Sequence, residues 1–307
     1  APGRRVVIDD FHPDLRTIAR FTPSRGMKMT PRRLQVFRKV MALRAVGGPR
    51  DVEVVQLGKG TGVRVHRPAG RAAPSAALLW IHGGGYVIGC AAQDDKLCER
   101  FARTLGVVVA SVEYRVAPEY PYPAALDDCE TALNWLLARP DVDSSRIAIG
   151  GASAGGGLTA ALALRLRDQG NQHAVMQLLT YPMLDDRPAF RPDPDPKRRR
   201  LLDQGANRFG WESYLGGGQA RHAVPARARD LGGLPPTWIG VGTMDLLFNE
   251  CVEYADRLKQ SGVQCALEVV PGAFHGFDLL FPKAGVSRRF FESQRAALSG
   301  ALSRQSR

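Results

Sequence analysis

The chain has 307 residues, of which 44% are hydrophobic and 23% are charged. This balance excludes a disordered chain, which would lack the apolar residues needed to build a core. The longest apolar run, residues 76–81, is far shorter than the roughly 18 to 20 residues that cross a bilayer, so we expect no stable membrane insertion.

Basic residues outnumber acidic ones by 42 to 30, which gives a net charge of +12 and leaves an anionic partner open. The densest basic run, residues 197–200, has no aromatic residues interleaved for base stacking. We therefore expect this run to be a solvated loop or helix face, and we expect no nucleic-acid site.

The five cysteines, at positions 90, 98, 129, 251 and 265, form no Cys-x-x-Cys pair. An odd number without close spacing predicts neither a disulfide framework nor a zinc site. We expect mostly buried thiols in a reducing compartment, hence a cytoplasmic protein, and we expect no metal or other cofactor.

The first 47 residues have a partly helical pattern, because Leu34, Phe37 and Met41 recur at intervals of three and four. From about residue 52 the pattern changes to strands, since residues 52–55 and 63–65 alternate and are separated by a glycine-rich turn. Six largely apolar runs follow, at residues 76–81, 107–112, 147–149, 176–179, 238–241 and 266–270. Helical stretches lie between them, at residues 94–105, 124–138, 154–167 and 249–261. This alternation predicts an α/β fold, with a mostly parallel central sheet flanked by helices.

One interval between predicted strands is unusually long. Between residues 179 and 238 lie four closely spaced prolines and a helical stretch at residues 204–215. Such insertions often lie over a sheet edge and shape a pocket. We expect a single domain, 1–307, in which residues 1–47 and 187–233 form a helical cap over a core of residues 50–186 and 234–305.

A Gly-x-Ser-x-Gly sequence, Gly151 to Gly155, lies between a predicted strand and a predicted helix. A sharp turn at this place exposes the serine oxygen and crowds the backbone, so the neighbouring residues must be small. The helix directs its free N–H groups toward the reacting centre. The pattern indicates a nucleophile at Ser153, and a plain glycine-rich turn is the alternative.

A glycine run, His82-Gly83-Gly84-Gly85-Tyr86, directly follows the strand at residues 76–81. Acyl transfer requires N–H donors where the carbonyl oxygen becomes an anion, and a glycine run lets the backbone present them. A phosphate-binding loop is the rival interpretation, but neither Gly-x-x-x-x-Gly-Lys-Ser/Thr nor a helix-opening Gly-x-Gly-x-x-Gly is found. We expect the side chain of His82 to brace this loop.

A serine nucleophile needs a base and a group that orients the base. Of six histidines, His275 directly follows the last predicted strand, at the sheet edge that also carries Ser153. Asp245 ends the preceding strand and is the expected orienting acid, with a helix N-cap as its alternative role. Glu250 competes for the role of acid, but it lies within the next predicted helix.

Five motifs in this order resemble the hormone-sensitive-lipase-like branch of α/β-hydrolase esterases, the bacterial family IV carboxylesterases. The motifs are residues 82–86, 113–119 with 123–124, 151–156, Asp245 with Glu250, and 275–277. The resemblance covers most of residues 50–305 and implies the α/β-hydrolase fold, with residues 114–119 holding the turn beside the glycine loop. Ala152 and Leu246 depart from the family, which often has Asp and Pro at these positions, and so leave the substrate open.

By position, the resemblance implies Ser153 as nucleophile, His275 as base and Asp245 as orienting acid. It also implies an oxyanion hole formed by the N–H groups of Gly84, Gly85 and Ala154. The aromatic residues expected to line the substrate site are Tyr86 and, unless they form the core of the cap, Phe37, Phe209, Trp211 and Tyr214.

The activity that the resemblance implies is that of a serine carboxylesterase, which hydrolyses short- to medium-chain acyl esters through an acyl-enzyme intermediate. An amidase or a deacetylase would use the same triad. Relatives that bind small molecules without hydrolysing them typically lack the histidine, and a binder of anionic surfaces is a third interpretation. The expected partner is a small-molecule ester, and the resemblance leaves a homodimer open.

Overall fold

The computed structural model describes residues 8–24, 33–39, 52–70, 73–218 and 222–303. Within these ranges, eight strands form one sheet in the order β1-β2-β4-β3-β5-β6-β7-β8. The strands are β1 (Glu53–Gly58), β2 (Thr61–His66), β3 (Ser75–Ile81), β4 (Val108–Glu113), β5 (Val142–Ala152), β6 (Ala174–Thr180), β7 (Thr237–Gly242) and β8 (Cys265–Val270). β2 pairs antiparallel with both β1 and β4, and all other neighbours are parallel. The predicted mostly parallel sheet is confirmed.

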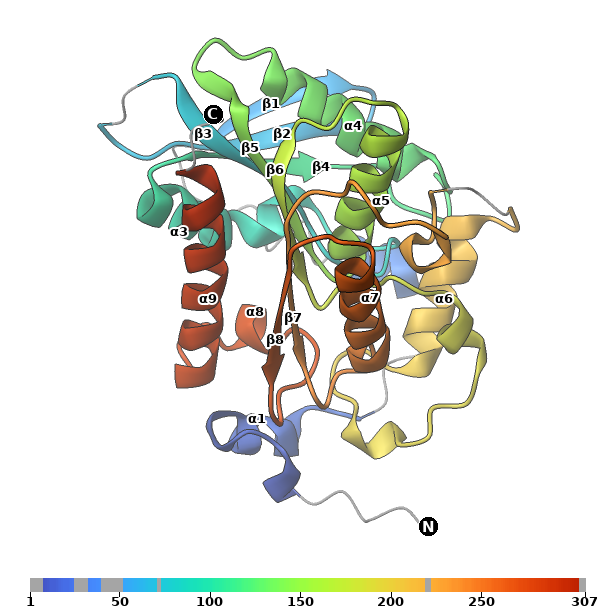
Figure 1. Ribbon diagram of the computed structural model, residues 1–307. Helices are drawn as coiled ribbons and strands as arrows, with labels where there is room; N and C mark the ends of the chain where they lie inside the picture. Colours follow the sequence, from blue (N-terminus) through green and yellow to red (C-terminus); the bar gives the residue numbers. More distant parts are fainter. Residues whose placement is uncertain (1–7, 25–32, 40–51, 71–72, 219–221, 304–307) are drawn as a thin grey trace.

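Helices cover both faces of this sheet (Figure 1). On one face, α3 (Asp95–Leu105) and α9 (Gly285–Leu302) pack against the sheet and against each other. On the other face lie α4 (Ala124–Leu137), α5 (Ala154–Asp168) and α7 (Phe248–Gln260). Short α1 (Arg16–Phe21) precedes the sheet, and α8 (Phe277–Leu280) connects β8 to α9.

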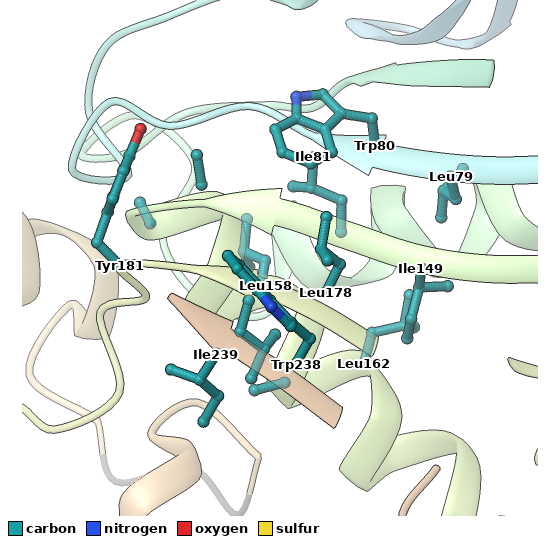
Figure 2. Close-up of a cluster of buried hydrophobic side chains, with 14 of the residues drawn as sticks. Leu79, Trp80, Ile81, Ile149, Leu158, Leu162, Leu178, Tyr181, Trp238 and Ile239 are labelled. Carbon is teal, nitrogen blue, oxygen red and sulfur yellow. The ribbon is translucent and has the colours of Figure 1, made fainter. Parts of the chain in front are cut away.

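The core holds the carboxyl ends of the parallel strands in register. Figure 2 shows buried hydrophobic side chains of this core, most of which come from β3, β5, β6, β7 and α5. Burying each such side chain contributes about 1.5–3 kcal/mol. In this register Ile81 of β3 pairs with Gly151 of β5, which pairs with Leu179 of β6. The residues that directly follow these strands therefore meet at one edge of the sheet.

Helix α9 was not predicted from the sequence. Its buried face includes Val286, Phe290 and Leu298 at helical spacing, but it also carries the polar residues Ser287 and Gln294. These polar residues interrupt the apolar periodicity on which a sequence prediction relies.

The predicted N-terminal helical region is only partly described. Residues 33–39 form a helix in which Leu34 is buried and Phe37 is 40% exposed. Met41, the remaining member of the predicted pattern, lies outside the described residues.

The predicted insertion leaves β6 and returns at β7, and it contains α6 (Gln204–Leu215) as expected. Helix α6 packs directly on the glycine loop, because a Cβ at Gly210 would lie 2.6 Å from the carbonyl oxygen of Gly85. Only a residue without a side chain allows this approach at that position.

The prediction that residues 197–200 form a solvated surface is wrong for two of the four residues. Arg199 pairs with Asp193 at 2.8 Å and donates to the backbone carbonyl of Asp245. Arg200 donates to the carbonyl of Ala19 and lies over the ring of Phe11. The planar guanidinium groups thus hold the insertion against the β7–α7 loop and the N-terminal segment.

In the part of the chain that the structure describes, no helix has both the length and the apolar character to cross a membrane.

Candidate active site

Ser153 occupies the sharp turn between β5 and α5. Its φ is +56° and its ψ is −120°, a conformation that residues with side chains seldom adopt. A Cβ at Gly155 would lie 2.0 Å from the carbonyl oxygen of Ile81, so the turn fits against β3 only because position 155 is glycine. The backbone of Ser153 is fixed from both sides, since its N–H donates to Thr180 and its carbonyl accepts from Gly157 and Met183.

Three side chains from three different loops form a chain of hydrogen bonds. His275 Nε2 lies 2.9 Å from Ser153 Oγ, and His275 Nδ1 lies 2.9 Å from Asp245 Oδ2. The Asp245 side chain is fully buried and that of His275 is 12% exposed. An acceptor on Nδ1 favours the tautomer with a proton there, which leaves Nε2 free to accept the serine proton.

The two candidates for the acid, Asp245 and Glu250, differ in their contacts. Asp245 does not cap α7, whose N-cap is Leu247, but its Oδ1 accepts the N–H of Leu247 and so holds the carboxylate toward His275. Glu250 lies in the first turn of α7 and accepts the N–H groups of Leu184 and Asp185. Glu250 therefore stabilises the loop after β6, and burial raises the pKa of its carboxyl well above the ordinary value.

The N–H groups of Gly84, Gly85 and Ala154 are oriented by the carbonyls that precede them. In a trans peptide the C=O and the following N–H point in opposite directions, so a fixed carbonyl fixes the next N–H. The carbonyl of Gly83 accepts from His82 and Gln93, that of Gly84 from Val87 and Ile88, and that of Ser153 from Gly157 and Met183. Within the described ranges, no hydrogen bond uses the three N–H groups themselves.

The glycine loop and the serine turn lie in contact. A Cβ at Gly83 would lie 3.0 Å from the carbonyl oxygen of Ala152 and 3.3 Å from Ser153 Cβ. Because of this contact, the free N–H groups of Gly84 and Gly85 in the loop and of Ala154 at the start of α5 lie in the neighbourhood of the Ser153 side chain.

Comparisons with known proteins agree with this arrangement. The model of a family described as the alpha/beta hydrolase fold matches residues 78–279. The chain belongs to the α/β-hydrolase family. Carboxylesterase NlhH of Mycobacterium tuberculosis is 36% identical over 238 residues, which are 72% of this chain and 73% of that protein. An acetyl-hydrolase of Streptomyces hygroscopicus is 31% identical over 91% of this chain and 92% of its own length.

Solved structures extend the likeness to nearly the whole chain. The crystal structure of esterase LipW from Mycobacterium marinum superposes with a TM-score of 0.85 and 32% identity, covering 97% of this chain and 98% of that one. The resemblance to hormone-sensitive-lipase-like esterases is thereby confirmed, and this hydrolase is a carboxylic ester hydrolase.

His82 braces the glycine loop of this hydrolase, as predicted. The side chain is fully buried, its Nδ1 lies 2.8 Å from the Gly83 carbonyl, and its ring stacks on Tyr114 with centroids 4.1 Å apart. Burial lowers the pKa of His82 to about 4, so the ring is neutral and Nδ1–H is the donor. The hydroxyl of Tyr114 donates to the His82 carbonyl, and Ala117 donates to that of Tyr86, which confirms that residues 114–119 hold the turn.

The aromatic residues predicted at the substrate site fall into two groups. Tyr86, Trp211 and Tyr214 are at most 1% exposed and pack on one another, with Tyr86 and Tyr214 stacked 4.1 Å apart. Phe209 is partly buried in a small cluster with Leu34, and Phe37 is exposed. The first group thus forms the contact between α6 and the glycine loop.

Two residues near the site, Tyr181 and Leu201, were not identified from the sequence, whereas Asp278 was considered as the orienting acid and set aside because it follows His275 too closely to fold back. Tyr181 follows β6 and makes an edge contact with the His275 ring, with centroids 4.8 Å apart, and its hydroxyl donates to Asp278. Leu201 has a φ of +68°, is 45% exposed and lies 3.4 Å from the Cβ position at Gly276. Tyr181 could have been predicted near the site, because it follows a strand that ends at the same sheet edge as Ser153. No pattern in the sequence around Leu201 indicates that it lies near the site.

The described residues contain no group of three or more histidine, cysteine, aspartate or glutamate side chains that could hold a metal ion.

Proposed function

We propose that this hydrolase is a serine carboxylesterase that acts through an acyl-enzyme on short- to medium-chain esters. The observation that carries the proposal is the continuous chain from Ser153 Oγ through His275 to Asp245, with both hydrogen bonds at 2.9 Å. A nucleophile, a base and an orienting carboxylate in hydrogen-bond contact are the parts that acyl transfer requires.

The first half of the reaction forms the acyl-enzyme. Ser153 Oγ attacks the ester carbonyl carbon while His275 Nε2 takes the hydroxyl proton, and the carbonyl oxygen becomes an anion. Asp245 stabilises the imidazolium without taking a proton. When the tetrahedral intermediate collapses, the bond to the leaving alkoxide breaks and His275 gives it the proton.

The second half returns the enzyme to its starting state. A water molecule attacks the acyl carbon, His275 takes one of its protons, and collapse breaks the bond to Ser153 Oγ, which regains the proton. The N–H groups of Gly84, Gly85 and Ala154 form the oxyanion hole in both halves. Each such donor is worth about 3 kcal/mol of transition-state stabilisation.

The substrate range is limited by what packs against the glycine loop. Helix α6 approaches Gly85 closely, and the rigid Tyr86, Trp211 and Tyr214 cluster keeps it there. The side chains of these three residues are buried, so they support the acyl site from behind and do not line it. The more exposed Phe37 and Phe209 are left to contact the substrate, from a cap that we assign to residues 1–47 and 187–233. Leu201 adds apolar surface beside the His275 loop. A relative named as an acetyl-hydrolase supports the short end of the range.

Hydrolysis of p-nitrophenyl esters of increasing acyl length tests this proposal. Wild type should hydrolyse short esters fastest, and Ser153→Ala or His275→Ala should lower kcat by at least ~10³-fold. Ser287→Ala is the matched control, because Ser287 is also buried but lies on α9. The kcat/KM of wild type should fall on acidification, because a general base must be unprotonated to accept the serine proton. Full activity of Ser153→Ala would refute the proposal, and turnover of anilides in place of esters would redirect it to an amidase.

A further inference from the structure

A second carboxyl group lies near His275, besides that of Asp245. The hydroxyl of Tyr181 donates to Asp278 Oδ1 at 2.8 Å, and the same tyrosine ring makes the edge contact with His275 at 4.8 Å. Asp278 lies on α8, three residues after His275. This hydrogen bond therefore ties the loop that carries the base to the end of β6.

Tyr181 is held in place by its backbone. Its φ is +36°, which is strained for a residue with a side chain, and its N–H donates to the Gly240 carbonyl at 2.7 Å. The preceding residue, Thr180, accepts the N–H of Ser153. In Figure 2, Tyr181 lies at the edge of the buried cluster, where the chain leaves the sheet. The tyrosine thus connects the serine turn, the His275 ring and Asp278.

The charge of Asp278 is set by opposing effects. Burial raises the pKa of Asp278 to about 6, while the Tyr181 hydroxyl, nearby backbone N–H groups and the charge of His275 act to lower it. Burial raises the pKa of Tyr181 well above its ordinary value, so the tyrosine is the donor. The carboxyls of Asp94 and Asp245 also act on this pair. Above about pH 6 Asp278 is therefore a carboxylate, and it is bonded to the tyrosine that packs against the ring of His275.

We propose that Asp278 and Tyr181 are positioning residues for His275. Tyr181 fixes the plane of the imidazole ring, and the Asp278 carboxylate stabilises the imidazolium that forms when Ser153 loses its proton. Asp278 supplies charge near the base and takes no proton from the substrate. The inference rests on the proposed function, because it assigns an imidazolium to the reaction cycle.

The test compares three variants by the pH dependence of kcat/KM on p-nitrophenyl acetate. Asp278→Asn keeps an acceptor for Tyr181 but removes the charge, so the midpoint should move to lower pH by about half a unit to one unit. Its kcat at pH 8 should fall about 3- to 10-fold, in step with that shift. Tyr181→Phe keeps the ring and removes the hydroxyl, so it should lower kcat, and adding it to Asp278→Asn should have little further effect.

Asp143→Asn is the matched control. Asp143 lies at the opposite end of β5 from Ser153, and it also carries a full charge, because bonds from Ser145 and Arg146 lower the pKa of Asp143 to about 2. This variant should leave the midpoint unchanged. A folded Asp278→Asn variant with an unshifted midpoint would overturn the inference, as would an equal shift in Asp143→Asn.

A second measurement separates this inference from the proposed function. The His275 ring can be titrated by NMR in the Ser153→Ala background, where no turnover is needed. Adding Asp278→Asn should lower the midpoint of that titration by a similar amount. If wild type hydrolyses no ester but the titration shifts, the proposed function fails while the charge contact stands. If wild type is active and neither midpoint moves, only this inference fails.

Discussion

Replacing His82 separates bracing of the glycine loop from the chemistry of the triad. His82 donates from Nδ1 to the Gly83 carbonyl and thereby orients the N–H of Gly84. His82→Leu removes the donor while keeping a comparable apolar volume. His82→Asn is the matched variant, because its amide N–H can occupy the place of Nδ1 while the ring contact with Tyr114 is lost.

The expected loss follows from the contacts at the Gly83 carbonyl. A whole oxyanion donor is worth about 3 kcal/mol, or about 10²-fold in kcat. Gln93 still holds the same carbonyl at 3.2 Å, so His82→Leu should free it only in part. We expect kcat to fall about 10- to 100-fold with little change in KM, and His82→Asn to retain more of the rate than His82→Leu.

Stability should respond to the same replacement. A buried hydrogen bond contributes about 1 kcal/mol and the ring stacking about 1 kcal/mol, so His82→Leu should lower the free energy of unfolding at pH 8 by about 2 kcal/mol. The folded-state pKa of His82 is about 4, below the ordinary 6.5. The unfolded chain therefore takes up this proton first as the pH falls, and stability is lost between about pH 6.5 and pH 4. Both variants should lose less stability over that window than wild type does.

Steady-state kinetics and urea denaturation at pH 8 and pH 5 measure these effects together. Wild-type kcat in a folded His82→Leu variant would refute the argument that the Gly83 carbonyl controls the donor. A kcat for His82→Asn equal to that of His82→Leu would show that the ring contact, and not the hydrogen bond, matters.

Three further variants test other parts of the structure. Gly84→Ala should lower kcat at least about 10²-fold in a variant whose fold is checked by circular dichroism, because φ is +134° and a Cβ would lie 2.0 Å from a carbonyl oxygen. Asp94→Asn should raise the free energy of unfolding by about 2 kcal/mol at pH 8 but not near pH 4, because burial raises the pKa of Asp94 to about 7 and folding then opposes its ionisation. Urea denaturation at both pH values measures the effect, and an equal gain in stability at pH 8 and pH 4 would contradict this argument. Arg199→Met should lower the free energy of unfolding by about 3 kcal/mol, because it leaves the buried Asp193 carboxylate without its partner, and an unchanged value would contradict the pairing.

The sequence predicted those parts of the site that depend on local backbone geometry. Glycines 83, 84, 151 and 155 mark turns where a Cβ would meet a backbone carbonyl, and apolar runs mark the strands whose ends carry Ser153, Asp245 and His275. Parallel strands end at one edge of a sheet, so the order of the strands was enough to bring these side chains together.

Contacts between distant segments could not be predicted in the same way. Tyr181 and Asp278 are 97 residues apart, and Arg199 and Asp245 are 46 apart. The residues around each of these side chains do not indicate its distant partner. In a basic run, for example, an arginine that binds backbone carbonyls cannot be distinguished by sequence from one that is exposed. Helix α9 was not predicted, because polar side chains on its buried face interrupt the apolar periodicity.

Covalent labelling of the nucleophile tests the central claim most directly. Diethyl p-nitrophenyl phosphate phosphorylates an activated serine and releases one p-nitrophenol for each site. We predict one diethylphosphoryl group per chain, found by mass spectrometry on Ser153, with loss of esterase activity in proportion to labelling and no label in Ser153→Ala. Labelling at another residue, or inactivation that proceeds equally in Ser153→Ala, would contradict the account.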